Sequence, residues 1–198
     1  MSPKSVLRPL ILASTSRYRA ALLERFGLRF NTASPGVDES GFPAEPPEAR
    51  ARRLSEAKAE AVARQFPEAV IIGGDQVPAA GATVLTKPGN AANCREQLRL
   101  LSGASAAFHT ACTVRCMATD LAVTHVDTTT VRMRALSDAE IDRYIEREQP
   151  FDCAGGFKAE ALGITLFERM DSEDPTAIVG LPLIWLAGAL RSAGYQVP

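Results

Sequence analysis

The feature that most constrains the fold is a pair of long strand-like stretches on either side of a short polar turn. Residues 108–117 and 121–134 are rich in β-branched and apolar side chains, and the chain reverses between them around Asp120. So short a connection allows the two strands to pair only in antiparallel orientation. A sheet that contains this hairpin cannot be uniformly parallel.

Elsewhere the sequence alternates between strand and helix signals. Apolar runs predict strands, and apolar residues at helical spacing predict helices. The expected strands are residues 10–12, 70–72 and 164–169, and the expected helices are residues 17–26, 47–66, 91–101, 138–148 and 183–192. Ser137 and Glu140 form a capping box at the start of the fourth helix. This order indicates an α/β fold with a mixed, partly antiparallel sheet flanked by helices.

Length, composition and charge limit the class of protein. The 198 residues suit a single domain, expected to span residues 1–198. With 46% hydrophobic and 23% charged residues, the composition is ordinary for a soluble globular protein. A formal net charge of −1 gives no general attraction to nucleic acid or to an acidic membrane, so neither is expected as a partner. The most apolar stretch, residues 177–190, is shorter than the roughly 20 residues that a membrane span needs.

The cysteines and the N-terminus point to a reducing compartment. The four cysteines form no CxxC pair and no metal-ligand pattern with the two histidines, so we expect free, mostly buried thiols. The N-terminus lacks the apolar core and cleavage site of a secretory signal. Both observations favour a cytoplasmic protein. The cysteines are Cys94, Cys112, Cys116 and Cys153.

The turn between the first strand and the first helix is a candidate anion site. Backbone N–H groups at a helix start and the hydroxyls of Ser14 and Ser16 can donate to an anion, and Ser16 is a plausible N-cap. Arg17 and Arg19 lie at the positive end of the helix dipole, which costs roughly 0.3–1 kcal/mol each if they are unpaired. A bound polyphosphate would pair with both arginines and turn this cost into a favourable interaction. The alternative is that both arginines extend into solvent.

A second candidate follows the buried strand at residues 70–72. Two glycines lead to Asp75, which is expected at the carboxyl end of the strand, where α/β sheets bind ligands. A carboxylate there can hold a divalent cation or act as a general base. The alternative is an aspartate that caps a turn after glycines.

Other polar segments carry further acids and lysines. Glu39 in "VDES", Lys87 in "TKPGN" and Lys158 in "GGFK" lie in expected loops, and each segment could simply be a polar turn. Lys58 lies in a helix, where a lysine is more often solvated than a ligand. The chain has no GxxxxGK[ST], no GxGxxG after a strand and no hydrolase triad motif. With two histidines only, base chemistry is expected from carboxylates.

Taken in order, these segments resemble the Maf family of nucleotide pyrophosphatases. The resemblance covers nearly the whole chain and rests on "LILASTSRYRAALLERFG", "VDES", "LSEAKAEAVA", "IIGGDQV", "TKP", "LSGASAAFHT", "LSDAEIDRYI", "DCAGGFKAEALGITLFERM" and "IVGLPL". It implies a Maf/inosine-triphosphatase-like fold with two lobes around a central cleft. It also implies hydrolysis between the α and β phosphates of a nucleoside triphosphate.

Within the family, the chain is similar to the 7-methyl-GTP pyrophosphatase branch. The resemblance makes Tyr18, Gln76 and Glu160 the specificity residues, whereas the dTTP/UTP branch typically has Arg, Thr and Gln at these places. N7-methylation makes guanine cationic, which adds a cation–π term of roughly 0.5–2 kcal/mol on an aromatic ring. In this chain Arg17 replaces the family's usual proline, and Tyr18 replaces the branch's usual tryptophan.

The resemblance also implies a role for each remaining site residue. Asp75 would be the proton acceptor, and Glu39 with Asp75 would hold a divalent cation, Mg²⁺ or Mn²⁺. The phosphates would contact Ser14, Arg19, Lys58, Lys87 and Lys158. The expected partner is a small-molecule nucleotide, and the resemblance suggests a homodimer. Two alternatives stay open: a dTTP/UTP pyrophosphatase of the same fold, and a nucleotide-sensing regulator of cell division.

Overall fold

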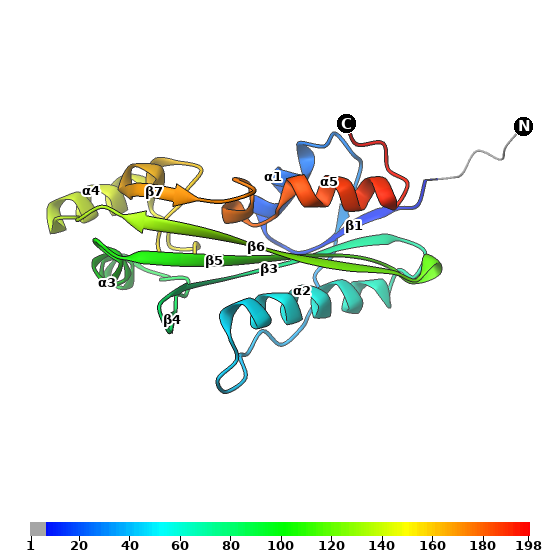
Figure 1. The fold of residues 1–198 in the computed structure, drawn as a ribbon, viewed down its shortest axis with the longest axis horizontal. Helices are drawn as coiled ribbons and strands as arrows, with labels where there is room; N and C mark the ends of the chain where they lie inside the picture. The colour runs from blue at the N-terminus through cyan, green and yellow to red at the C-terminus, as the bar shows by residue number, and fades with distance from the viewer. Residues whose placement is uncertain (1–6) are drawn as a thin grey trace, which may run out of the picture.

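The computed structural model describes residues 7–198, so residues 1–6 of the predicted domain lie outside it. One seven-stranded sheet is flanked by α-helices on both faces (Figure 1). The strands are β1 Leu10–Ala13, β2 Asn31–Thr32, β3 Val70–Ala80, β4 Thr83–Val84, β5 Ser105–Cys116, β6 Leu121–Met133 and β7 Phe167–Asp171. The helices are α1 Arg17–Glu24, α2 Pro47–Ala63, α3 Ala91–Leu101, α4 Asp138–Glu148 and α5 Leu183–Ser192, with 3₁₀ turns η1 Met117–Thr119, η2 Leu162–Leu166 and η3 Ala177–Val179.

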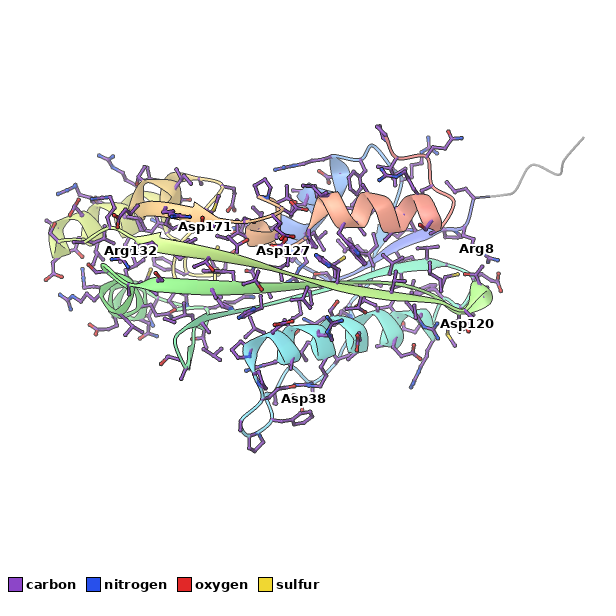
Figure 2. All side chains as sticks on the ribbon, viewed as in Figure 1. Arg8, Asp38, Asp120, Asp127, Arg132 and Asp171 are labelled. Carbon is purple, nitrogen blue, oxygen red and sulfur yellow. The ribbon has the colours of Figure 1, made fainter. Side chains whose placement is uncertain are left out.

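The sheet is mixed, as predicted. Its strand order is β2-β1-β3-β5-β6-β7, with β4 paired to β3. β1 runs parallel to β2 and β3, and every other pairing is antiparallel. The predicted hairpin is β5–β6, and Asp120 makes its turn in the left-handed conformation with φ 52°. Figure 2 shows Asp120 at the tip of this hairpin and Arg132 toward the opposite end of β6.

Helices divide the molecule into two lobes that share the long strands. α1 and α5 cover one face of the sheet at the β1 end, α2 covers the opposite face, and α3 and α4 flank the other end (Figure 1). Leu12, Leu22 and Leu186 belong to the core under α1 and α5. Leu98 and Ile141 belong to a separate core between α3, α4 and the sheet. The predicted two-lobed α/β fold is therefore confirmed.

Most helix boundaries agree with the sequence predictions. α3, α4 and α5 have the expected limits, and the capping box of Ser137 and Glu140 is present. α1 and α2 end two to three residues early, at Glu24 and Ala63. β7 starts at Phe167, later than predicted, because η2 takes up the preceding residues. Among residues 7–198, no helix combines the length and apolar character needed to cross a membrane.

The strand β3 differs most from its prediction. The sequence predicts that it ends at Ile72, but it continues through both glycines to Ala80. A Cβ on Gly73 would collide with the Ser55 carbonyl oxygen, so this glycine allows the α2 backbone to lie against the strand. A Cβ on Gly74 would meet the Leu181 side chain at 3.1 Å and the Arg19 side chain at 3.3 Å. The glycines therefore allow close packing against the strand. Because Asp75 lies within β3, the interpretation of Asp75 as the cap of a turn is wrong.

Candidate active site

The candidate site lies where β3 has a free edge. β1 ends at Ala13, paired with Gly73, and β4 joins β3 only at Ala79. Between these points, one edge of β3 has no neighbouring strand in the described chain. A cavity of about 660 Å³ opens there, a volume typical of small-molecule sites. Asp75 thus lies inside β3, just beyond the point where the parallel strand β1 ends.

Both lobes contribute to the cavity wall. It is formed by the β1–α1 turn, the loop after β2, α2, β3, and the loops around residues 152–160 and 178–180. Nine of the ten predicted site residues line it: Ser14, Tyr18, Arg19, Glu39, Lys58, Asp75, Gln76, Lys87 and Glu160. Residues spread over most of the sequence therefore meet in one cleft.

Lys58 joins two carboxylates at the base of the cleft. Its Nζ lies 2.7 Å from Asp75 Oδ1 and 2.6 Å from Glu39 Oε1. Because side chains alternate along a strand, Asp75 faces α2 as Gly73 does, and Lys58 reaches it from the buried side of that helix. Lys58 is only 5% exposed, so the alternative of a solvated helix lysine is wrong.

Glu39 is held in its charged form. Burial favours the neutral acid, but the hydrogen bond from Lys58 and the charges of Lys58, Arg19 and Lys87 together lower the pKa of Glu39 below its ordinary value. The site therefore presents a carboxylate here at neutral pH. Such a group accepts hydrogen bonds or binds a cation.

Arg19 is enclosed beside Ser14. Its Nε donates to the Gly180 carbonyl at 3.1 Å, and its Nη1 lies 3.5 Å from Ser14 Oγ. Enclosure lowers the pKa of the guanidinium, while the carboxylates of Asp75 and Glu39 oppose that shift. Arginine stays protonated in proteins, so a cation faces the cleft. Solvation of Arg19 is thereby ruled out, whereas Arg17 is largely exposed, and Ser16 caps α1 as expected.

Gln76 projects from the opposite face of β3 to Asp75. Its Nε2 donates to Thr110 Oγ1 at 2.9 Å and to the carbonyls of Ala177 and Ile178 at 3.1 and 3.0 Å. With the nitrogen occupied in this way, the side-chain oxygen has no hydrogen-bond partner among residues 7–198. It is left to accept from a ligand. Nothing in the sequence pointed to Thr110 or η3 as partners of Gln76.

Tyr18 and Glu160 lie on the two walls of the cleft. Tyr18 is half-buried and lines the cavity. Its hydroxyl lies 3.1 Å from Asp152 Oδ2. Glu160 is exposed and also lines the cavity. Asp152 was not among the predicted site residues, although it begins the segment "DCAGGFKAEALG" that contributed to the family resemblance.

Lys158 departs from its predicted position. It is absent from the cavity lining, and its Nζ donates to the Glu148 carbonyl and to Glu148 Oε1, both at 3.0 Å. Glu148 Oε2 in turn accepts from the Leu162 backbone. This pair ties the loop that carries Glu160 to the end of α4. The prediction that Lys158 contacts phosphate does not fit this geometry, because its charge is neutralised outside the cleft.

The carboxylates suit a metal that also binds the substrate. Within the described chain, no group of three or more His, Cys, Asp or Glu side chains could hold a metal ion by itself. Glu39 and Asp75 nevertheless bring two carboxylates to the same ammonium group. Magnesium commonly binds through one or two carboxylates together with substrate phosphates. The donor set therefore fits a hard divalent cation shared with a phosphorylated ligand.

Comparison with known proteins identifies the family. The profile of the family described as Maf-like protein matches residues 9–193. The chain belongs to the Maf family. Within the Maf family it is 50% identical over 189 residues to a protein of Xanthomonas axonopodis pv. citri, covering 96% of this chain and 98% of that one. It is 49% identical to a protein of Aromatoleum aromaticum, with 96% and 97% covered, and 47% identical to one of Polaromonas sp., with 96% and 87% covered.

All three Maf relatives are named 7-methyl-GTP pyrophosphatase. The resemblance drawn from the ordered sequence segments is therefore confirmed at the level of the family. Its motifs also converge in space, since all but Lys158 of the predicted residues line the same cleft of the Maf chain.

Proposed function

We propose that this chain is a metal-dependent nucleotide pyrophosphatase that hydrolyses 7-methyl-GTP to 7-methyl-GMP and pyrophosphate, which clears a modified nucleotide from the pool. The observation that carries the proposal is the buried Lys58 between Asp75 and Glu39, in a cleft that Arg19 also enters. The names of the relatives support the same activity and substrate.

The triphosphate would bind at the cationic side of the cleft. Arg19 and Ser14 offer donors at the start of α1, and Lys58 and Lys87 add positive charge from the other walls. Phosphoryl transfer depends mainly on positioning and on neutralising charge, which these groups supply. Lys158 has no part in this proposal.

Asp75 is the proposed proton acceptor. Its carboxylate contacts Lys58 and lies in the cleft at the free edge of β3. A water beside the bound phosphates could therefore reach it and transfer a proton to it. Glu39 and Asp75 are the residues that would hold Mg²⁺ or Mn²⁺. The chemistry that such an ion supplies when bound is neutralisation of phosphate charge and polarisation of the attacked phosphorus.

The base would be selected by three side chains. The Tyr18 ring provides an aromatic face, on which a cationic methylguanine gains roughly 0.5–2 kcal/mol over a neutral base. The Glu160 carboxylate can accept from the N1–H and amino groups of guanine, and the free oxygen of Gln76 provides a further acceptor. Thymine and uracil lack the matching amino donor.

A panel of nucleoside triphosphates with Mg²⁺ or Mn²⁺ tests this proposal through the release of pyrophosphate. We expect 7-methyl-GTP to give the highest kcat/KM. A higher value for dTTP or UTP would favour the alternative substrate class on the same fold. Binding without turnover of any nucleotide would favour a nucleotide-sensing regulator of cell division.

The wider biological setting belongs to the same proposal. We propose a single domain over residues 1–198, a cytoplasmic location, a nucleotide as the ligand, and assembly as a homodimer. The four cysteines are all free, three of them buried, which supports a reducing compartment. Gel filtration with light scattering tests the homodimer, and a monomeric mass would contradict it.

A further inference from the structure

A polar cluster joins the two walls of the cleft at its rim. The Tyr18 hydroxyl lies 3.2 and 3.1 Å from the two carboxylate oxygens of Asp152. Arg17 Nη2 donates to the Tyr18 hydroxyl at 2.9 Å and to Asp152 Oδ2 at 3.0 Å. The three side chains thus form a closed triangle of hydrogen bonds.

The triangle brings together distant parts of the fold. Arg17 and Tyr18 begin α1, whereas Asp152 follows α4 in the other lobe. All three line the cleft. None of their hydrogen bonds reaches Lys58, Asp75 or Glu39, so the cluster is separate from the group assigned to proton transfer.

One face of the Tyr18 ring is already occupied. The Arg17 guanidinium carbon lies 4.9 Å from the ring centroid, within the range of a cation–π contact. A base that stacks on Tyr18 therefore takes the opposite face. With its hydroxyl held by Asp152 and one face covered, the ring has little freedom to swing across the cleft.

We propose that Asp152 is a positioning residue that acts through the Tyr18 hydroxyl and fixes the ring as the wall on which the methylated base stacks. This inference rests on the proposed function and deepens it by adding a specificity-determining residue. Asp152 does not touch the reacting phosphates in this account. It lowers the cost of ordering Tyr18 when the nucleotide binds.

A double-mutant cycle tests the inference. The variants are Tyr18→Phe, which keeps the ring but removes the hydroxyl, Asp152→Ala, and the two combined. Each single change is expected to raise KM for 7-methyl-GTP by about 3- to 10-fold, the effect of one hydrogen bond at a partly exposed site. The kcat should change by less than about twofold, because the proton acceptor is untouched. Glu146→Gln, an exposed acid on α4, is the matched control and should leave both constants unchanged.

The combined variant decides the outcome. If Asp152 acts through the hydroxyl, its replacement has no further effect once the hydroxyl is gone, so the double variant has the KM of Tyr18→Phe. Multiplied effects, or a normal KM in Asp152→Ala, would overturn the inference. Titration of 7-methyl-GMP by calorimetry gives the same comparison without turnover, and thermal melts identify any variant that fails to fold. If the wild type does not hydrolyse 7-methyl-GTP, the proposed function fails; the calorimetric cycle still judges the coupling of Asp152 to Tyr18.

Discussion

At the scale of single residues, the charge balance around Lys58 decides which substitutions are informative. Lys58 and Asp75 are both buried, and removing one member of a buried ion pair typically costs 3–5 kcal/mol because the other charge is left uncompensated. Glu39 is a second partner for Lys58. A neutral amide at position 75 therefore still leaves the ammonium paired, whereas loss of Lys58 would leave two carboxylates facing each other.

The variant Asp75→Asn is expected to fold and to lose activity. The amide oxygen can still accept from Lys58, but the side chain can no longer take a proton. We expect kcat to fall by at least about 10²-fold, the lower end for loss of a general base. Pyrophosphate release measures the loss, and circular dichroism checks the fold. Turnover at the wild-type rate would remove Asp75 from the mechanism.

Replacing each of the two glycines before Asp75 by alanine should have a different effect on stability and activity. Gly73→Ala places a methyl group against the α2 backbone, which cannot move aside easily, so we expect a loss of about 1–3 kcal/mol in the free energy of unfolding. Gly74→Ala meets two side chains instead of backbone, those of the buried Leu181 and of Arg19. It should keep more of its stability but raise KM, because Arg19 is displaced. Urea denaturation and steady-state kinetics separate the two, and equal stability losses would contradict this account.

At the scale of elements, the sequence is sufficient to predict where a helix begins when a capping side chain within the same segment fixes that end. Asn90 and Ser137 cap α3 and α4 with their side chains, and both helices have the predicted limits. The continuation of β3 was missed because two glycines read as a turn unless a helix is known to lie against them. The pairing of Lys158 with Glu148 and of Tyr18 with Asp152 depends on how loops are placed by the tertiary fold, which residue spacing does not encode.

The loop before α2, which carries Glu39, is held by an ion pair with a defined pH range. Arg53 donates to both carboxylate oxygens of Glu45 at 2.6 and 2.8 Å, and it also contacts the Ser40 carbonyl. The hydrogen bond from Arg53 lowers the pKa of Glu45 to about 2, below the ordinary value of 4.5. A lowered pKa means that the pair stabilises the folded state fully above pH 4.5 and loses this contribution as the pH falls toward 2.

Glu45→Gln should therefore be less stable than the wild type at pH 7, and the difference should shrink between pH 4.5 and 2. Urea midpoints of both proteins across this range measure the effect. Glu146→Gln, without a partner for its carboxyl in the described chain, serves as the control. A stability difference that stays constant down to pH 2 would show that the pair does not act through its charge.

At the scale of the whole molecule, the cleft exists because strand lengths differ. β1 has four residues and β3 has eleven. β3 therefore has no strand beside Asp75 on the β1 side, while β5 and β6 continue into the second lobe. The long strands hold the lobes together, and the two walls touch at the rim through Tyr18 and Asp152. A nucleotide that fills the cleft would contact both lobes at once.

Binding should therefore protect both lobes together. We expect 7-methyl-GMP to slow amide hydrogen exchange in residues 14–19 and in residues 152–160, since both segments line the cleft. The hairpin tip at Asp120, which Figure 2 shows at the end of β6, contributes no residue to the cleft and provides an internal control. At a ligand concentration 100 times Kd, the free energy of unfolding should rise by about 2.7 kcal/mol. Protection limited to residues 14–19 would mean that the nucleotide engages one lobe only, and the bridging role of the loop at residues 152–160 would then be wrong.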